Sequence, residues 1–294
     1  MGSKNRVALD LFREMLKIKP KAKYFIDLFG GGGAMSFTAL QLGLNVTYNE
    51  LQSDLVNFIR YILDRVKTGQ RGNYGLFPDE FYKFITREDF KRLRTESTQL
   101  AQFARICYSF GNNQKNYLFC EDIEKTKHLA HNIVVFQCQE SLKEFNALTE
   151  SNVKINDLHG WNNRRLDFQA QIRVARNLAE LERLEQLQRL EQLEQLERLH
   201  NIKLLNLDYK DVLINTPPEE TIVYLDPPYR GTAGYIEGAI HSEIDTYFKS
   251  LPYTAFMSEY NAPFRSIFEI KKTKLLNNSA AKKTKALEKL YINN

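Results

Sequence analysis

The residues best suited to chemistry form a tetrapeptide in the last third of the chain, Asp226-Pro227-Pro228-Tyr229. The Asp226 carboxylate and the Pro227 carbonyl are hydrogen-bond acceptors, and the two prolines hold the turn rigid and have no backbone N–H. The ring of Tyr229 offers a flat face for a planar base. The tetrapeptide predicts a pocket for an amino group attached to an aromatic ring, although its plainer interpretation is a turn that ends a strand.

Three apolar runs predict the strands that position this chemistry. The run 221–225 predicts a buried parallel strand with Asp226 at its carboxyl end, where open α/β sheets bind ligands. The run 23–27 predicts a second strand, followed by a four-glycine loop and a helix over 34–42. This unit is similar to a nucleotide-binding turn, but its spacing is neither GxGxxG nor that of a P-loop. A third strand over 44–48 precedes Glu50, about 20 residues after the loop, where an acid commonly binds ribose hydroxyls.

Together these motifs resemble a known family, the D12 class, or α group, of DNA adenine-N6 methyltransferases, which are relatives of the Dam methylases. The resemblance is carried by residues 24–36, Asn49-Glu50, Asn206-Leu207-Asp208-Tyr209, 225–229 and 290–293. Their order is that of the α group, in which a cofactor motif is followed by a target-recognition segment and then by a catalytic motif.

The resemblance implies an enzyme that transfers a methyl group from S-adenosylmethionine to the N6 amino group of adenine in a specific sequence of double-stranded DNA. The base would be flipped into a pocket formed by the catalytic residues, Asp226, Pro227, Pro228 and Tyr229. Glu50 would bind the cofactor's ribose, and Asp208 would contact its adenine. The full implied cofactor set is Asp27, Phe29, Gly31, Gly33, Glu50, Asp208 and Tyr209.

Two alternatives stay open from the residues. Cytosine-N4 transfer attacks a similar amine, although aspartate rather than serine at position 226 favours adenine. The second alternative is a non-catalytic DNA-binding or assembly protein on a methyltransferase scaffold. The family usually begins with a lysine-containing Gly-Gly-Lys segment. Residues 1–22 contain Gly2 but no such segment, and this difference motivates the second alternative. None of the nearby basic residues matches it: Arg6, Lys17, Lys19, Lys21 and Lys23.

We expect an α/β fold, with a Rossmann-like S-adenosylmethionine-dependent methyltransferase sheet interrupted by a mainly helical DNA-recognition domain. The catalytic domain would comprise residues 1–70 and 202–294, with further strands over 202–206 and 253–257 and an edge hairpin of 268–276 with 289–292. The recognition insert would comprise 71–177, where apolar residues between 89 and 110 fit one face of a single helix. Its expected DNA-binding residues are Asn112, Asn113, Gln114, Lys115, Arg164 and Arg165.

Residues 178–201 contain a leucine at every third position from Leu178 to Leu199. The composition favours a helix, but a period of three winds the leucines around all its sides. We interpret the segment as a spacer, with self-association as the alternative.

Composition excludes several other classes of protein. A net charge of +5 and 43% hydrophobic residues are compatible with a globular DNA-binding protein. The three cysteines, Cys107, Cys120 and Cys138, lack metal-ligand spacing, so no metal is expected. No apolar run is long enough to span a membrane. We expect a cytoplasmic protein, bacterial or phage-encoded, that acts in restriction–modification or phage DNA modification, with a cognate restriction enzyme as a candidate partner.

Overall fold

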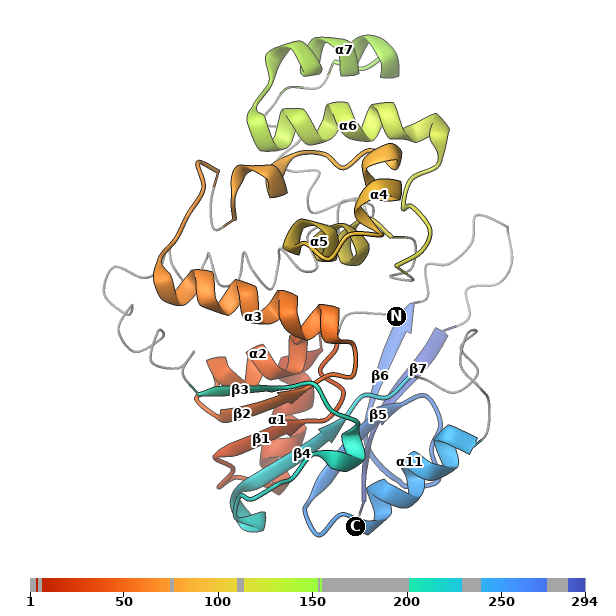
Figure 1. Cartoon of the computed structure of the whole chain (residues 1–294). Coiled ribbons are helices and arrows are strands. Elements are labelled where there is room, and N and C mark those ends of the chain that lie inside the picture. Colours follow the sequence, from red (N-terminus) through yellow and green to blue (C-terminus); the bar gives the residue numbers. More distant parts are fainter. Residues whose placement is uncertain are drawn as a thin grey trace. The chain divides into compact units, whose positions relative to one another are not determined.

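The computed structural model describes residues 4, 7–74, 77–109, 114–152, 154, 201–228, 239–273 and 285–293 (Figure 1). These residues form two compact units. The sheet unit contains the described residues up to Val56 and from 201 onward, and the helical unit contains those from Asn57 to 154. The predictions for Tyr229, Asn112, Asn113, Arg164, Arg165 and the leucine repeat over 178–199 lie outside the described residues.

The described strands of the sheet unit form one seven-stranded sheet in the order β3-β2-β1-β4-β5-β7-β6 (Figure 1). Strands β1 to β5 are parallel, and β7 runs antiparallel between β5 and β6. The order 3-2-1-4-5 is that of a doubly wound sheet, with its topological switch point between β1 and β4. The strands are β1 (Tyr24–Asp27), β2 (Asn45–Asn49), β3 (Ile202–Leu205), β4 (Thr221–Leu225), β5 (Ala255–Glu259), β6 (Arg265–Thr273) and β7 (Lys285–Ile292). All the predicted strands are therefore confirmed, including the edge hairpin, with small shifts at their ends.

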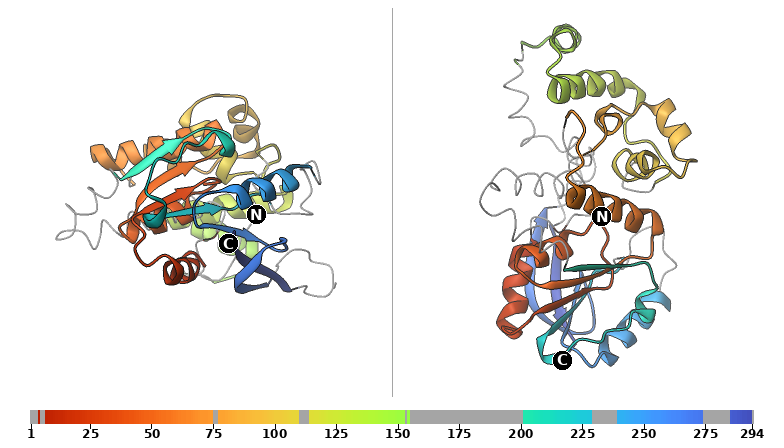
Figure 2. Two further views of the ribbon diagram at one scale, coloured as in Figure 1. Left: turned by 90° about the horizontal axis from the view of Figure 1, so that it is seen from below. Right: turned by 60° about the vertical axis from the view of Figure 1, so that its left-hand side comes forward.

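Helices cover both faces of this sheet because the side chains of a strand alternate between its faces (Figure 2). On one face, the Phe25 ring of β1 lies 4.9 Å from Phe12 of α1 (Ala8–Ile18) and 5.9 Å from Tyr224 of β4. Helix α2 (Ala34–Gln41) lies on the same face as α1. On the other face, alternate residues such as Ile26 pack against Phe248 of α11 (Ala239–Ser250). Every side chain of β4 is buried between these layers.

The described part of the helical unit is built around a phenylalanine-rich core. Phe58, Phe81 and Phe103 are neighbours in this core, with ring centroids 5.4 to 6.5 Å apart. Its elements are α3 (Ser53–Thr68), which begins in the sheet unit, a 3-10 turn (Asp79–Tyr82), α4 (Arg87–Leu93), α5 (Gln99–Cys107), α6 (Glu121–Phe136) and α7 (Gln139–Thr149).

The single helix predicted between 89 and 110 is wrong, because the structure has two helices there. Helix α4 ends at Leu93, and the Thr98 side chain accepts a hydrogen bond from the backbone N–H of Ala101 to begin α5. The buried Arg105 guanidinium donates to the carbonyls of Arg94 and Glu96, at 3.3 and 2.7 Å, and stabilises the turn between them. Polar side chains that cap a new helix thus compete with continuation of the preceding one. The spacing of apolar residues does not reveal this competition.

Candidate functional site

The glycine loop after β1 is shaped by close backbone packing. A side chain at Gly30 would collide with the buried Tyr48 ring of β2, because that ring occupies the space a Cβ atom would need. Tyr48 in turn donates its hydroxyl to the Gly31 carbonyl at 2.7 Å. Gly31 and Gly33 have φ values of 49° and 76°, in the left-handed region that favours glycine, and Gly33 starts α2. The loop is therefore held in one conformation by β2.

Glu50 follows β2, the strand predicted before it, and its side chain lies against the glycine loop. Its Oε2 accepts a hydrogen bond from Gly31 N–H at 2.9 Å, and its Oε1 accepts one from Gln52 N–H at 2.9 Å. The carboxylate is thus fixed in orientation by two backbone donors.

Two asparagines join the loops that follow β1, β2 and β3. The buried Asn49 side chain donates to the carbonyls of Leu28 and Leu207 at 3.1 and 3.0 Å, and accepts from Leu207 N–H. Asn206 donates to the Glu50 carbonyl at 2.7 Å. Both belong to the motifs that carry the sequence resemblance, and in the structure their hydrogen bonds hold the loop ends together.

Asp208, Tyr209 and Phe29 lie together beyond these strands. The Asp208 carboxylate accepts from Lys210 N–H at 3.0 Å and begins a short 3-10 turn, Tyr209–Asp211. The turn brings the Tyr209 ring to 5.1 Å from the Phe29 ring, at an interplanar angle of 31°. Two aromatic residues implied by the resemblance are therefore in direct contact.

Asp27 ends β1 and is 1% exposed. Its Oδ2 accepts a hydrogen bond from the Ser36 hydroxyl of α2 at 2.7 Å, whereas its Oδ1 has no partner among the described residues. Burial, with smaller contributions from the charges of Asp226 and Glu50, raises the pKa of Asp27 to about 7, against the opposing effect of the Ser36 hydrogen bond. This carboxyl group therefore changes charge near neutral pH.

Asp226 follows β4 and forms an ion pair with Lys4. The Lys4 ammonium lies 2.6 and 2.7 Å from the two Asp226 oxygens and 2.9 Å from a Glu288 oxygen of β7. Lys4 and Glu288 are 3% and 1% exposed, whereas the Asp226 side chain is 24% exposed. Among the three charged side chains of this cluster, Asp226 is therefore the most accessible to solvent.

Lys4 and Glu288 are the residues that sequence reasoning missed. The available signal for Lys4 was its place in Gly2-Ser3-Lys4, which differs from the family's usual Gly-Gly-Lys by one residue. Glu288 carries no comparable signal, since it lies in an ordinary edge hairpin.

The structure brings together Asp27, Gly31, Glu50 and Asp226 at the carboxyl ends of β1, β2 and β4, beside the switch point. Gln114 and Lys115 belong instead to the helical unit. There Gln114 N–H donates to the Ser109 hydroxyl at 3.1 Å, and the exposed Lys115 accepts a hydrogen bond from Arg94 through its carbonyl at 3.1 Å.

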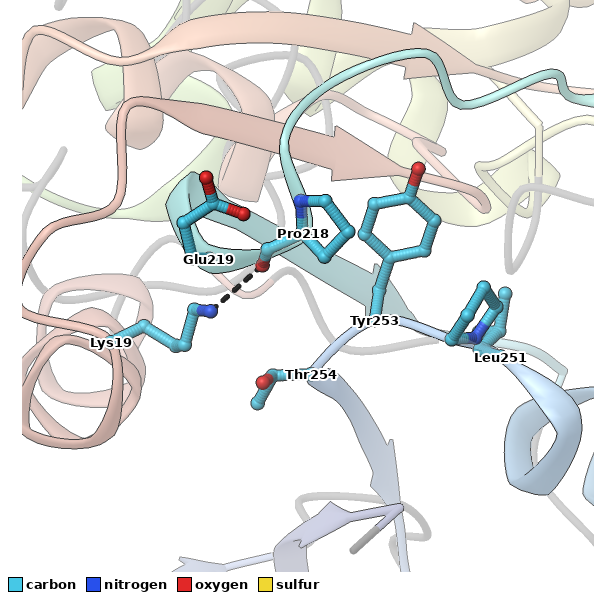
Figure 3. A pocket seen from close by; sticks show the side chains of 7 residues that line it. Lys19, Pro218, Glu219, Leu251, Tyr253 and Thr254 are labelled. Carbon is cyan, nitrogen blue, oxygen red and sulfur yellow. Dashed lines mark hydrogen bonds between the residues drawn. The ribbon is translucent and has the colours of Figure 1, made fainter.

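A shallow pocket lies at the opposite end of the strands, before β4 and β5 begin (Figure 3). Lys19 closes one side by donating to the Pro218 carbonyl at 2.8 Å, and Tyr253 lines another. Because doubly wound sheets bind ligands at the carboxyl ends, this pocket is separate from the candidate site.

The described part of the chain contains no group of three or more histidine, cysteine, aspartate or glutamate side chains that could hold a metal ion. Among the helices in that part, none is long and apolar enough to cross a membrane.

A doubly wound sheet with a glycine loop at one side of its switch point and an acidic Pro-Pro turn at the other defines a class, the Rossmann-like methyltransferases. The family model for D12 class N6 adenine-specific DNA methyltransferase matches residues 1–292, which is nearly the whole chain. The chain belongs to this family, and it is an enzyme that methylates adenine N6 in DNA. The resemblance stated from the motifs is thereby confirmed. Among individual curated proteins, none matches the chain.

Proposed function

We propose that the methyl donor is S-adenosylmethionine and that it binds between the glycine loop and Asp226, where adenine N6 is methylated. The observation that carries this proposal is the meeting of Asp27, Glu50 and Asp226 at the switch point of the sheet, since doubly wound folds bind nucleotides there.

The residues present fit such a cofactor. Asp27 Oδ1 and the Tyr209 hydroxyl are buried polar atoms without a hydrogen-bond partner among the described residues, so both can bond a ligand. A Cβ atom at Gly32 would meet nothing within 4 Å, and a Cβ atom at Gly31 would meet only the Phe29 carbonyl oxygen, at 4.0 Å. The loop backbone is therefore open on one side to a close ligand.

The remaining cofactor contacts follow from chemistry. Each carboxylate oxygen has two lone pairs, so Glu50 keeps acceptor capacity for ribose hydroxyls after binding its two backbone donors. The Phe29 and Tyr209 rings offer apolar surface for a planar base. Asp208, adjacent to Tyr209, keeps an oxygen that accepts from an exocyclic amine.

The transfer itself needs mainly positioning, because the bound cofactor supplies an already activated methyl group. Asp226 and the Pro227 carbonyl accept the two N6 hydrogens, which localises the nitrogen lone pair and aims it. Held in this way, N6 would accept the methyl group that the bound cofactor supplies, and it would release one proton to solvent. Tyr229, outside the described residues, stacks on the flipped base and offsets part of its unstacking cost.

We assign recognition of the DNA sequence to the segment 71–177. Support comes from the interleaving of aromatic, basic and amide residues there, because amides read adenine edges and lysine or arginine binds phosphates. Asn112, Asn113, Gln114, Lys115, Arg164 and Arg165 remain the candidates. The modification would serve restriction–modification or phage DNA protection.

A calorimetric titration with S-adenosylmethionine tests the proposed cofactor site. The wild-type protein is expected to bind it, and Phe29→Ala to bind at least about tenfold more weakly, since one lost contact of about 1.4 kcal/mol has that effect. Asp226→Ala is the matched control, because it removes a base contact and leaves cofactor affinity largely intact. No binding by the wild-type protein, or equal affinity in Phe29→Ala, would contradict the proposed site.

A further inference from the structure

We propose that Glu288 is a positioning residue for methyl transfer, which from strand β7 holds the Lys4 ammonium against Asp226. The inference deepens the proposed function of Asp226 and rests on it. Glu288 itself would touch neither the base nor the cofactor, because it acts through Lys4.

The geometry of Lys4 is the first support. An ammonium has three N–H donors, and three carboxylate oxygens lie within 2.9 Å of it, two from Asp226 and one from Glu288. These carboxylates come from sequence positions far apart, after β4 and within β7. Lys4 is therefore fixed from two strands at once.

The burial of Glu288 is the second support. At 1% exposure, an ionised carboxylate loses several kcal/mol of hydration, and an ion pair of good geometry is needed to offset this. Position 288 is paired with Ile270 in the middle of the β6–β7 hairpin, where the backbone is held by strand pairing. A buried acid on a rigid strand is well placed to define where a lysine side chain lies.

The charges of the cluster are the third support. Burial alone would lower the pKa of Lys4, but the attraction of Asp226 and Glu288 outweighs it and leaves the pKa above its ordinary value. Lys4 with Asp226 alone would be neutral, whereas Glu288 gives the three groups a net charge of −1. The cluster around Asp226 therefore keeps a net negative charge. This charge strengthens hydrogen bonds from an amine that becomes positive during methylation.

Other titratable groups surround the cluster. Tyr260, which follows β5, lies within electrostatic range of Lys4 and Glu288. Tyr224 of β4 lies within range of Asp226 and Glu288, and Asp27 of β1 within range of Asp226. Asp226 and Glu288 are the groups that contribute to the raised pKa of Lys4.

Glu288→Gln tests the proposal, because it removes the charge and keeps the shape. We expect kcat for DNA methylation to fall at least about tenfold, with the KM for S-adenosylmethionine changed less than threefold. The alkaline limb of the pH–rate profile should move to lower pH, because Lys4 loses its proton more readily. Glu269→Gln is the matched control, since Glu269 forms a half-exposed ion pair with Lys289 on the same hairpin at 3.3 Å.

Glu288→Asp keeps the negative charge but shortens the side chain by one methylene group, which moves the carboxylate away from Lys4. It also provides a test if Glu288→Gln does not fold. We expect its kcat and its alkaline limb to lie between those of the wild type and Glu288→Gln. Wild-type kinetics in Glu288→Asp and Glu288→Gln alike, or the same loss in Glu269→Gln, would overturn the proposal.

A second measurement keeps this inference separate from the proposed function. In protein labelled with 13C at the lysine ε carbon, Lys4 is assigned by the loss of its signal in Lys4→Met. Its titration midpoint should fall on the order of one pH unit in Glu288→Gln and stay unchanged in Glu269→Gln. An unchanged midpoint in Glu288→Gln would overturn the inference. If the wild-type protein methylated no adenine, the proposed function would fail while this titration still decided what Glu288 does.

Discussion

Two aspartates that end neighbouring strands lie in opposite electrostatic environments. Asp27 is buried with one hydroxyl donor, and burial is the main cause that raises its pKa to about 7. Asp226 is partly exposed and has an ammonium on both oxygens. These surroundings support the different roles proposed for the two carboxyl groups, Asp27 toward the cofactor and Asp226 toward the amine.

Asp27→Asn should show how the raised pKa affects stability. Between about pH 4 and pH 7, the folded chain holds a proton on Asp27 that the unfolded chain has lost, so the wild type loses stability as pH rises through this range. The asparagine variant has no such dependence at this site. The free energy of unfolding of Asp27→Asn minus that of the wild type should be roughly 3 kcal/mol larger at pH 8 than at pH 5. Urea unfolding at the two pH values measures this difference. An advantage of equal size at both pH values would contradict the environment described for Asp27.

Candidate site residues that are recognisable by type and spacing could be predicted from the sequence, whereas the pairing of residues that are distant in the chain could not. Asp226 and Glu50 are recognisable because each follows a strand at a position with a known chemical use. The Lys4 ammonium meets Asp226, 222 residues away, within 2.7 Å, and it also pairs with Glu288. The Gly2-Ser3-Lys4 run is a local signal for Lys4, but no local pattern gives its pairing with Glu288.

At the scale of elements, the glycine loop depends on the strand beside it. Gly30→Ala should lower the free energy of unfolding by about 1–3 kcal/mol, because the added methyl would displace the buried Tyr48 ring. Tyr48 would then release the Gly31 carbonyl, so cofactor affinity should fall as well.

Gly32→Ala is the control for stability, because Gly32 is exposed and an added methyl there would meet nothing within 4 Å. Urea unfolding of the two variants provides the comparison. Equal stability of Gly30→Ala and Gly32→Ala would show that Tyr48 does not shape the loop.

The break between α4 and α5 gives a prediction for the helical unit. Thr98→Ala removes the side chain that caps α5 and should reduce stability by about 1 kcal/mol. Thr95→Ala, in the same turn, removes only an exposed hydroxyl that donates to the Arg92 carbonyl, and should have a smaller effect. Chemical denaturation distinguishes the two, and an effect of Thr98→Ala no larger than that of Thr95→Ala would count against the cap.

These elements also show where sequence patterns succeed and fail. The strand 221–225 is predicted at its observed bounds, because five apolar or β-branched residues end at a Pro-Pro turn that cannot continue the ladder. The helical spacing around Leu93 and Phe103 correctly indicates burial, since both are in one core. It fails to reveal the break because the cap at Thr98 and the Arg105 contacts are formed by polar side chains.

At the scale of the whole molecule, the described residues form two compact units. The sheet unit contains the described residues proposed to bind the cofactor and the amine, and the helical unit contains the described part of the segment proposed to read DNA. The family match over residues 1–292 includes both. Methylation of a specific DNA sequence would therefore require the two units in one chain.

The most direct test is to incubate the protein with radiolabelled S-adenosylmethionine and unmethylated genomic DNA, digest the DNA to nucleosides and identify the labelled base. We predict label in N6-methyladenine, with a loss of at least about 100-fold in Asp226→Ala, as when a key transition-state contact is removed. Label in N4-methylcytosine, no label in any base, or undiminished label in Asp226→Ala would contradict adenine methylation at the Asp226 site.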